Sequence, residues 1–271
     1  MNEHERKKMI KETFNTVAAG YDNHALRYFS ESAKIMAACL NLKGDEHVLD
    51  VATGTGYVAL AVCQEVPRGR VTGVDFSTGM LVQARAKAAA NNISNVHFLE
   101  CDMQVLEFPD NHFDTAVCGF GIFFVENMGQ QLKHISDKVK PGGKVAICGF
   151  CDSAFLPVIE IFFDRIQQYG IERPPLSWKR IGTEEKVTSL YQSAGLQDIC
   201  VDRKNIGYYL KNADEWWDVI WFAGFRGLVN LLSPSDMERF KKEHLTEVQE
   251  LASGEGIWLN VDVLYTVGVK Q

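Results

Sequence analysis

The stretch from His47 to Gly56, which reads HVLDVATGTG, decides the fold and the kind of site. Its apolar residues suit a central parallel strand, because such strands are buried on both faces; they are Val48, Leu49 and Val51. Gly54 and Gly56 follow, and a residue without a Cβ lets backbone N–H groups come close to a ligand. Residues 57–65 are expected to form a helix. A strand, a glycine turn and a helix start predict a site for a charged, nucleotide-like ligand.

The sequence on either side of this stretch alternates β-branched runs with helical patterns, which is typical of a parallel sheet covered by helices. We expect strands near residues 46–51, 70–75, 95–100, 113–119 and 143–150, and helices at 57–65, 79–91 and 130–139. Ser77 is the expected N-cap of the second helix. A helix at 184–193, a strand at 196–205, a helix at 235–251 and one long final strand at 257–269 complete the pattern.

Composition narrows the class of protein. The chain has 271 residues, 46% of them hydrophobic, which suits one elaborated domain. The net charge is −7 and the basic residues are scattered, which argues against a nucleic-acid partner. No apolar run approaches the roughly 18 residues of a membrane span, and the charged start MNEHERKKMIK is not a secretory signal, so we expect a cytoplasmic protein. The seven cysteines show no zinc-site spacing, and no metal is expected.

A ribose-bearing ligand needs an acid that accepts its two hydroxyl hydrogens. Asp75 ends the second expected strand 19 residues after Gly56, close to the spacing of about 20 residues found in dinucleotide-binding proteins. The segment GTGYVA also reads as the G-x-G-x-x-A fingerprint of those proteins. The glycine turn alone therefore leaves two classes of cofactor open, a nicotinamide dinucleotide and another adenosine-bearing molecule.

Five segments in order resemble the class I S-adenosylmethionine-dependent methyltransferases. They are VLDVATGTG with Asp50, GVDFS with Asp75, FLECDM with Asp102, FDTAVCGFGIFFV, and LKHISDKVKPGGKVAI. The opening FNTVAAGYD, together with CGFG and VKPGG, is most similar to small-molecule methyltransferases related to the ubiquinone and menaquinone biosynthesis enzymes. Those enzymes typically have an Arg-Asn pair after the fourth strand, where this chain has Ile122, Phe123 and Phe124. The chain departs from the quinone enzymes at that turn.

The resemblance implies a donor site for S-adenosylmethionine, which becomes S-adenosylhomocysteine. It implies that the methionine portion lies against the backbone of Ala52, Thr53, Gly54 and Gly56, with Asp50 near the amino end. Asp75 would accept from the ribose hydroxyls, and Phe76 and Met80 would cover the adenine. Asp102 and the Met103 backbone would meet the adenine edge. Further donor contacts would come from Tyr21, Gly119 and Phe120.

Candidate acceptor and catalytic residues lie outside these five segments. Tyr21 and His24 lie in the segment that closes over the donor in relatives, and an imidazole has the right strength for a general base near neutral pH. Trp217, Trp221 and Arg226 lie in the late insertion where small-molecule members build an acceptor cap. Aromatic residues at helical spacing are also ordinary packing residues. If these residues form the acceptor cap, they predict an apolar or aromatic acceptor.

The expected architecture is a doubly wound, seven-stranded, mostly parallel sheet whose last strand is antiparallel, as the resemblance implies. We expect a single domain over residues 1–271, with a helical lid at 1–44, the donor-binding core at 45–150 and acceptor-cap insertions at 152–182 and 206–255. The expected reaction is direct displacement of the methyl group onto a small-molecule acceptor. The alternatives are a nicotinamide-dependent dehydrogenase and a non-catalytic protein that binds S-adenosylmethionine.

Overall fold

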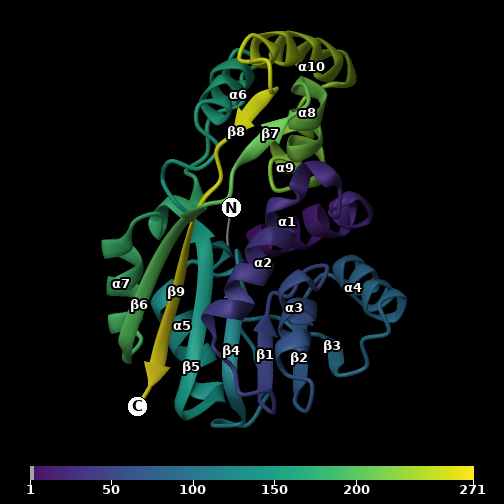
Figure 1. Ribbon diagram of the computed structural model, residues 1–271. Helices are drawn as coiled ribbons and strands as arrows, with labels where there is room; N and C mark the ends of the chain where they lie inside the picture. The colour runs from purple at the N-terminus through teal and green to yellow at the C-terminus, as the bar shows by residue number, and fades with distance from the viewer. Residues whose placement is uncertain (1–2) are drawn as a thin grey trace.

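The centre of the molecule is a seven-stranded sheet with the order β3-β2-β1-β4-β5-β9-β6 (Figure 1). The computed structural model describes residues 3–271. Strands β1 to β5 pair in parallel, whereas β9 is antiparallel to β5 and β6. The strands are β1 His47–Val51, β2 Arg70–Asp75, β3 Val96–Glu100, β4 Phe113–Gly119, β5 Val139–Phe150, β6 Leu196–Asn205 and β9 Asp262–Lys270. The predicted α/β sheet with an antiparallel last strand is confirmed.

The helices that connect the strands begin at side-chain caps. Ser77 accepts a hydrogen bond from the Met80 N–H at 3.2 Å, which satisfies one free donor of the first turn of α4. Asn127 caps α5 and Thr183 caps α7 in the same way. These helices are α3 Tyr57–Glu65, α4 Thr78–Ala90, α5 Met128–Lys138 and α7 Glu184–Ser193. In Figure 1, α2 crosses in front of the sheet and α5 lies behind it.

Two helices and two short 3-10 turns precede the sheet. Helix α1 spans Glu3–Val17 and α2 spans Tyr28–Cys39, with η1 Ala18–Gly20 and η2 His24–Leu26 between them. The apolar face of α2 is buried and packs on α3. Helix α1, by contrast, is rich in charged residues and gave no apolar signal in the sequence. It lies against α4 and α9 and so covers the carboxyl ends of the strands.

A cap of helices and a small second sheet lies above the main sheet (Figure 1). Helix α10 packs on both α6 and α8, and β7 pairs with β8 in an antiparallel two-stranded sheet. The cap elements are α6 Val158–Gln167, β7 Tyr208–Leu210, α8 Ala213–Phe222, α9 Arg226–Val229, α10 Pro234–Gln249 and β8 Ile257–Leu259. The expected helix at 235–251 corresponds to α10. Helix α6 begins directly after Pro157 and was not expected inside the proline-containing insertion.

The single final strand expected at 257–269 is wrong. The chain forms β8 in the cap, leaves the sheet pattern at Asn260 and Val261, and then enters the main sheet as β9. The Asn260 amide donates to the Ser153 carbonyl at 2.7 Å, and the Val261 carbonyl accepts from the Ile206 N–H at 2.8 Å. The apolar pattern is similar on both sides of the break, so the local sequence does not mark it. We attribute the break to these hydrogen bonds with distant residues.

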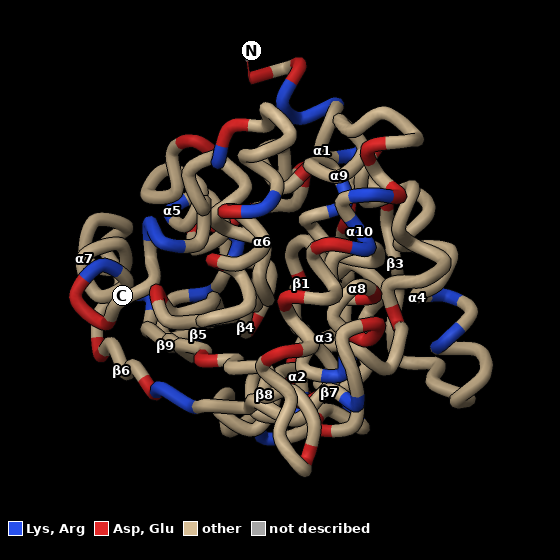
Figure 2. The backbone as a smooth tube through the Cα atoms, turned by 90° about the horizontal axis from the view of Figure 1, so that it is seen from above, with Lys and Arg blue, Asp and Glu red and all other residues tan. Residues whose placement is uncertain are grey.

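Charges are distributed over the whole molecule. In Figure 2, Lys and Arg lie among Asp and Glu, and no continuous basic stripe crosses the face that is shown. Within residues 3–271, no helix has both the length and the apolar character needed to cross a membrane. The same residues contain no cluster of three His, Cys, Asp or Glu side chains placed to hold a metal ion.

Candidate active site

A cavity of about 580 Å³ opens at the carboxyl ends of the parallel strands, below α1 and the cap. This is the edge at which such sheets bind ligands. The part that we call the donor half is lined by Asp50, Ala52, Thr53, Gly54, Asp75, Phe76, Met80, Asp102 and Met103. The part that we call the aromatic chamber is lined by Tyr28, Phe29, Phe120, Phe123, Phe150, Phe155, Phe163, Trp178 and Phe225.

The glycine turn forms the floor of the donor half. Gly54 has a left-handed backbone (φ +56°), and a Cβ built on it would meet nothing within 4 Å. The turn therefore leaves open space at Gly54, where a ligand fits against the backbone. Gly56 has a different role, because a Cβ there would lie 3.1 Å from Ala84 and from Phe98. Gly56 allows close packing below the turn and does not line the cavity.

Asp50 is a buried acid at the end of β1, with 1% of its surface exposed. Its Oδ2 accepts a hydrogen bond from the Thr53 hydroxyl at 2.6 Å. Its Oδ1 makes no hydrogen bond of normal geometry within the described residues, although the Ala59 N–H lies near the carboxylate. Burial raises the pKa of this carboxyl to about 7. The buried Oδ1 has no normal hydrogen-bond partner and lies near the open space at Gly54. It therefore suits a cationic ligand group.

Asp75 ends β2 and is held by the backbone of two turns. Its carboxylate accepts from the Gly54 N–H at 2.9 Å and from the Ser77 N–H at 2.8 Å. Burial is the largest influence on this carboxyl and raises its pKa, although the backbone N–H groups oppose that effect. The two hydrogen bonds fix the orientation of the carboxylate at the wall of the cavity.

Asp102 lies after β3, at the far end of the donor half. Its Oδ2 accepts from the Lys7 ammonium at 2.6 Å, and its Oδ1 accepts from the Gln104 N–H at 3.0 Å. Lys7 belongs to α1, so the first helix is tied to the residue that the resemblance places at the adenine edge. Phe76 and Met103 line the same region. Met80 also lines it but is 1% exposed to solvent.

The N-terminal segment covers the donor half and is anchored on α4. The Asn15 side-chain oxygen accepts from the Ser77 hydroxyl at 2.8 Å and from the Gly79 N–H at 3.0 Å. Asp22 accepts from the Thr55 hydroxyl at 2.7 Å and pairs with the Lys87 ammonium at 2.8 Å. Several polar contacts therefore hold this segment over the donor half.

Tyr21 lines the cavity as expected, but His24 does not. The Tyr21 ring stacks on Phe29 with a centroid distance of 4.9 Å. Burial and the nearby Asp75 carboxylate raise the pKa of Tyr21 far above its usual value, so its hydroxyl stays protonated. His24 is exposed in η2, outside the cavity. This placement gives no support to the expected role of His24 as a general base.

The expected acceptor residues Trp217, Trp221 and Arg226 also lie outside the cavity. Trp217 and Trp221 stack at 5.7 Å and line a separate pocket between α8 and α10, together with Met237 and Lys241. The Arg226 guanidinium lies 3.2 Å from the centroid of the Trp221 ring. Trp217 and Trp221, four residues apart, thus lie on the face of α8 that packs against α10 within the cap.

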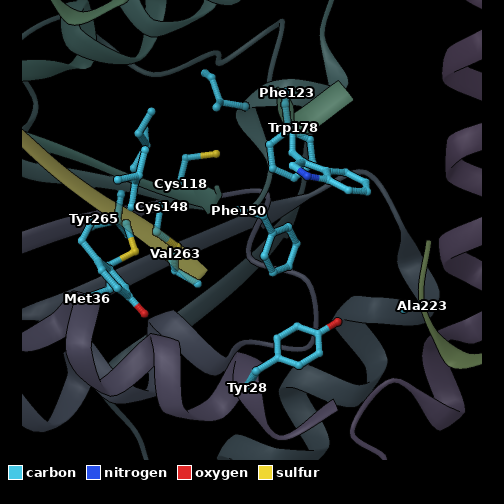
Figure 3. Close-up of a cluster of buried hydrophobic side chains, with 14 of the residues drawn as sticks. Tyr28, Met36, Cys118, Phe123, Cys148, Phe150, Trp178, Ala223, Val263 and Tyr265 are labelled. Carbon is cyan, nitrogen blue, oxygen red and sulfur yellow. The ribbon is translucent and has the colours of Figure 1, made fainter. Parts of the chain in front are cut away.

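The aromatic chamber is built largely from residues to which the sequence analysis assigned no role; Phe120 is the exception, since it was expected as a donor contact. Phe120 follows β4 with a left-handed backbone (φ +55°), and its ring lies 4.4 Å from Phe150 and 5.4 Å from Phe29. A Cβ on Gly121 would lie 2.8 Å from the Ala52 Cβ, so the turns after β1 and β4 touch. The chamber therefore adjoins the donor half at this contact. Figure 3 shows Phe150 between Trp178 and Tyr28.

Arg180 fixes one edge of the chamber. Its guanidinium donates to the Val125 carbonyl at 2.7 Å and also to the Glu126 carbonyl. Val125 and Glu126 follow the short turn η3 Ile122–Phe124, which brings Phe123 and Phe124 to the cavity. Arg180 is thus engaged with the backbone.

Comparisons with known proteins agree with this geometry. Residues 48–143 match a methyltransferase domain family. A ubiquinone/menaquinone biosynthesis C-methyltransferase (UbiE) of Geobacter sulfurreducens is 29% identical over 212 residues, which are 72% of this chain and 83% of that protein. The UbiE of Geotalea daltonii is 32% identical over 187 residues, which are 61% of this chain and 79% of that protein.

Solved structures share the fold. The YcgJ protein of Bacillus subtilis superposes with a TM-score of 0.60 at 20% identity, over 89% of this chain and 98% of that one. A phosphoethanolamine N-methyltransferase of Haemonchus contortus, solved with S-adenosyl-L-methionine, superposes with a TM-score of 0.55 at 20% identity, over 89% of this chain and 52% of that one.

The open space at Gly54 and the unpartnered Asp50 oxygen fit the methionine end of S-adenosylmethionine. Of the two cofactor classes that the glycine turn left open, the relatives favour this one. The protein is therefore an enzyme with S-adenosylmethionine as its methyl donor, and the chain belongs to the class I S-adenosylmethionine-dependent methyltransferases that act on small molecules.

Proposed function

We propose that this methyltransferase acts on a small, apolar, aromatic acceptor bound in the aromatic chamber. The observation that carries the proposal is one continuous cavity, which joins the acids and the glycine turn of the donor half to a chamber of aromatic rings. Apolar pockets with few polar groups bind apolar ligands by removing their surface from water. The names of the relatives point to a quinone-type acceptor for those proteins.

We assign each part of S-adenosylmethionine to the residues of the donor half whose chemistry suits it. Bound S-adenosylmethionine supplies an electrophilic methyl group on a sulfonium. Asp75 accepts from the ribose hydroxyls, and Asp50 offers its free oxygen to the amino group. The backbone of residues 52–54 lies along the methionine portion. Phe76 and Met80 cover the adenine, whereas Asp102 and Met103 meet its edge.

In this scheme the chain acts chiefly by positioning. Holding a nucleophile in line with the reacting carbon can supply roughly 7–11 kcal/mol of the barrier. The turn of Gly119 and Phe120 lies where the donor half meets the chamber, which favours it as the site of transfer. The anchored segment at residues 3–44 would exclude water, and the insertions at 152–182 and 206–255 would roof the acceptor.

The Ile122-Phe123-Phe124 turn bears on the kind of acceptor. Phe123 and Phe124 both line the cavity, at the position where the quinone enzymes typically have Arg and Asn. This chain therefore has apolar rings in the cavity at the position of that polar pair. This difference favours a more apolar acceptor.

The test uses purified protein and S-adenosylmethionine labelled in the methyl group. The acceptors are 1,4-naphthohydroquinone, catechol and histamine, and the readout is label in the product of each. We expect transfer to the naphthohydroquinone at the highest kcat/KM and none to histamine. Preferential labelling of histamine would contradict the apolar, aromatic class of acceptor.

A further inference from the structure

The tyrosine hydroxyl groups of this chain divide into two sets. Of the eight tyrosines, four donate a hydroxyl hydrogen bond; they are Tyr169, Tyr191, Tyr208 and Tyr265. The hydroxyl groups of Tyr57 and Tyr209 lie beside the carboxylates of Asp22 and Glu255. The hydroxyl groups of Tyr21 and Tyr28 have no partner in the described part of the chain, and both residues line the cavity. Neither hydroxyl oxygen is among the fully buried polar atoms that lack a partner. Both hydroxyl groups are therefore open to the cavity and can form a hydrogen bond with a ligand there.

Tyr28 belongs to the aromatic chamber. It is 2% exposed, and its ring lies 4.4 Å from Phe29, 5.8 Å from Phe150 and 5.9 Å from Phe155. Figure 3 shows the hydroxyl end turned away from Met36 and towards the side on which Ala223 lies. Ala223 lines the cavity as well.

The hydroxyl of Tyr28 adds nothing to the packing of its ring. The neighbouring chamber positions hold phenylalanine, which would fill the same space without a polar atom to desolvate. Burial raises the pKa of Tyr28 well above its usual value, so the group is a hydrogen-bond donor at neutral pH. Tyr21 and Tyr28 both contact Phe29, so Tyr28 is one ring away from the donor half.

We propose that the Tyr28 hydroxyl donates a hydrogen bond to an oxygen atom of the acceptor and so orients its ring in the chamber. The proposal rests on the proposed function and makes it narrower, because the acceptor is then an aromatic ring that carries a hydroxyl or carbonyl oxygen. Tyr28 is a positioning residue in this scheme. The reacting methyl group and the nucleophilic atom do not touch it.

The experiment compares two probes on protein saturated with S-adenosylhomocysteine. The probes are 1-naphthol and naphthalene, which share a ring system and differ in one oxygen. Titration gives the ratio of their dissociation constants for the wild type, for Tyr28→Phe and for the control Tyr265→Phe. Tyr265 is a suitable control, because its buried hydroxyl donates to the Ser32 hydroxyl at 3.0 Å and it does not line the cavity.

In Tyr28→Phe the preference for 1-naphthol should fall about fivefold to tenfold, the effect of one hydrogen bond, while the naphthalene constant stays the same. Tyr265→Phe should keep the preference. The melting temperature should fall in Tyr265→Phe and hold or rise in Tyr28→Phe, which loses no internal bond.

An unchanged preference in Tyr28→Phe, or a wild type that binds neither probe, overturns the proposal. Binding of S-adenosylhomocysteine tests the methyltransferase site separately from the role of Tyr28. A wild type that does not bind S-adenosylhomocysteine contradicts the methyltransferase site itself, whereas normal binding of that product with an unchanged preference contradicts only the role of Tyr28.

Discussion

The donor half and the aromatic chamber share one cavity but are built in opposite ways. The donor half comes from short turns that follow β1, β2 and β3, and hydrogen bonds from backbone and side-chain groups fix its acids. The chamber takes its rings from α2, the turn after β4, the end of β5 and the cap; ring packing holds them, and hydrogen bonds from Arg180 fix one edge. One half is specified by local sequence and the other by tertiary structure, so substitutions should separate them.

The largest expected effect is on donor binding by Gly54→Val. A branched side chain would fill the open space at Gly54 and strain its left-handed backbone, so affinity for S-adenosylhomocysteine should fall by about 3 kcal/mol or more, measured by calorimetry. The control is Gly142→Val, since Gly142 is also left-handed (φ +77°) with nothing near its Cβ. Both variants should lose about 1–2 kcal/mol of stability. Equal donor binding by the two variants would contradict the assignment of Gly54 to the floor of the donor half.

Next in size is Asp75→Ala. Donor affinity should fall by about 1–3 kcal/mol, because charge-assisted hydrogen bonds to the ribose are lost. Asp114→Ala is the control, since the Asp114 carboxylate also accepts a backbone N–H, from His47 at 2.8 Å, but at the opposite end of the sheet. Calorimetry with S-adenosylhomocysteine that gave the wild-type constant for Asp75→Ala would remove the ribose assignment.

Donor affinity should also depend on pH through Asp50. The pKa of this buried carboxyl is about 7, and only the ionised form attracts a cationic amino group. Affinity should therefore rise about tenfold between pH 6 and pH 8 and should be flat in Asp50→Asn. The folding stability of the free protein changes with pH in the opposite direction. Because folding raises this pKa, the stabilising contribution of protonated Asp50 is present at low pH and is lost as the pH rises towards 7. A wild-type affinity that does not change with pH would contradict the role of Asp50.

A smaller effect is expected in the chamber. Ala223→Leu adds volume to the wall that Tyr28 faces, so the KM of the acceptor should rise about fivefold, at the lower end of the cost of overpacking. The dissociation constant of S-adenosylhomocysteine should stay at the wild-type value. A parallel loss of donor and acceptor binding would mean that the two halves are not separable.

The smallest effect is expected at Trp221. This residue lies outside the cavity under the Arg226 guanidinium, so Trp221→Phe should change kcat/KM by less than about twofold. Methyl transfer to 1,4-naphthohydroquinone measures it. A tenfold loss would restore the original expectation that this aromatic face contacts the acceptor.

Much of the scaffold could be predicted from the sequence, because it depends on local signals. The ends of β1 and β2, the Ser77 cap and the positions of Asp50, Asp75 and Asp102 all follow from strand patterns and turn residues. The identity of the cofactor did not follow from the glycine turn alone. It needed the order of the five segments, and then the relatives.

The rest could not be predicted, for physical reasons. The break at Asn260 and Val261 depends on hydrogen bonds to residues about 50 and 100 positions away. Aromatic residues of a chamber and of an ordinary core have the same spacing, so Trp217 and Trp221 gave a stronger signal than Tyr28. The one local hint at Tyr28 is a hydroxyl on an otherwise apolar face, and its lack of a partner is visible only in three dimensions.

The most direct test of the central claim is a crystal structure of the protein with S-adenosylhomocysteine. The account predicts that the ribose lies on Asp75, the amino group near Asp50, and the sulfur at the Gly119-Phe120 turn facing the aromatic chamber. A product molecule bound elsewhere, or one whose sulfur faces away from the chamber, would contradict it.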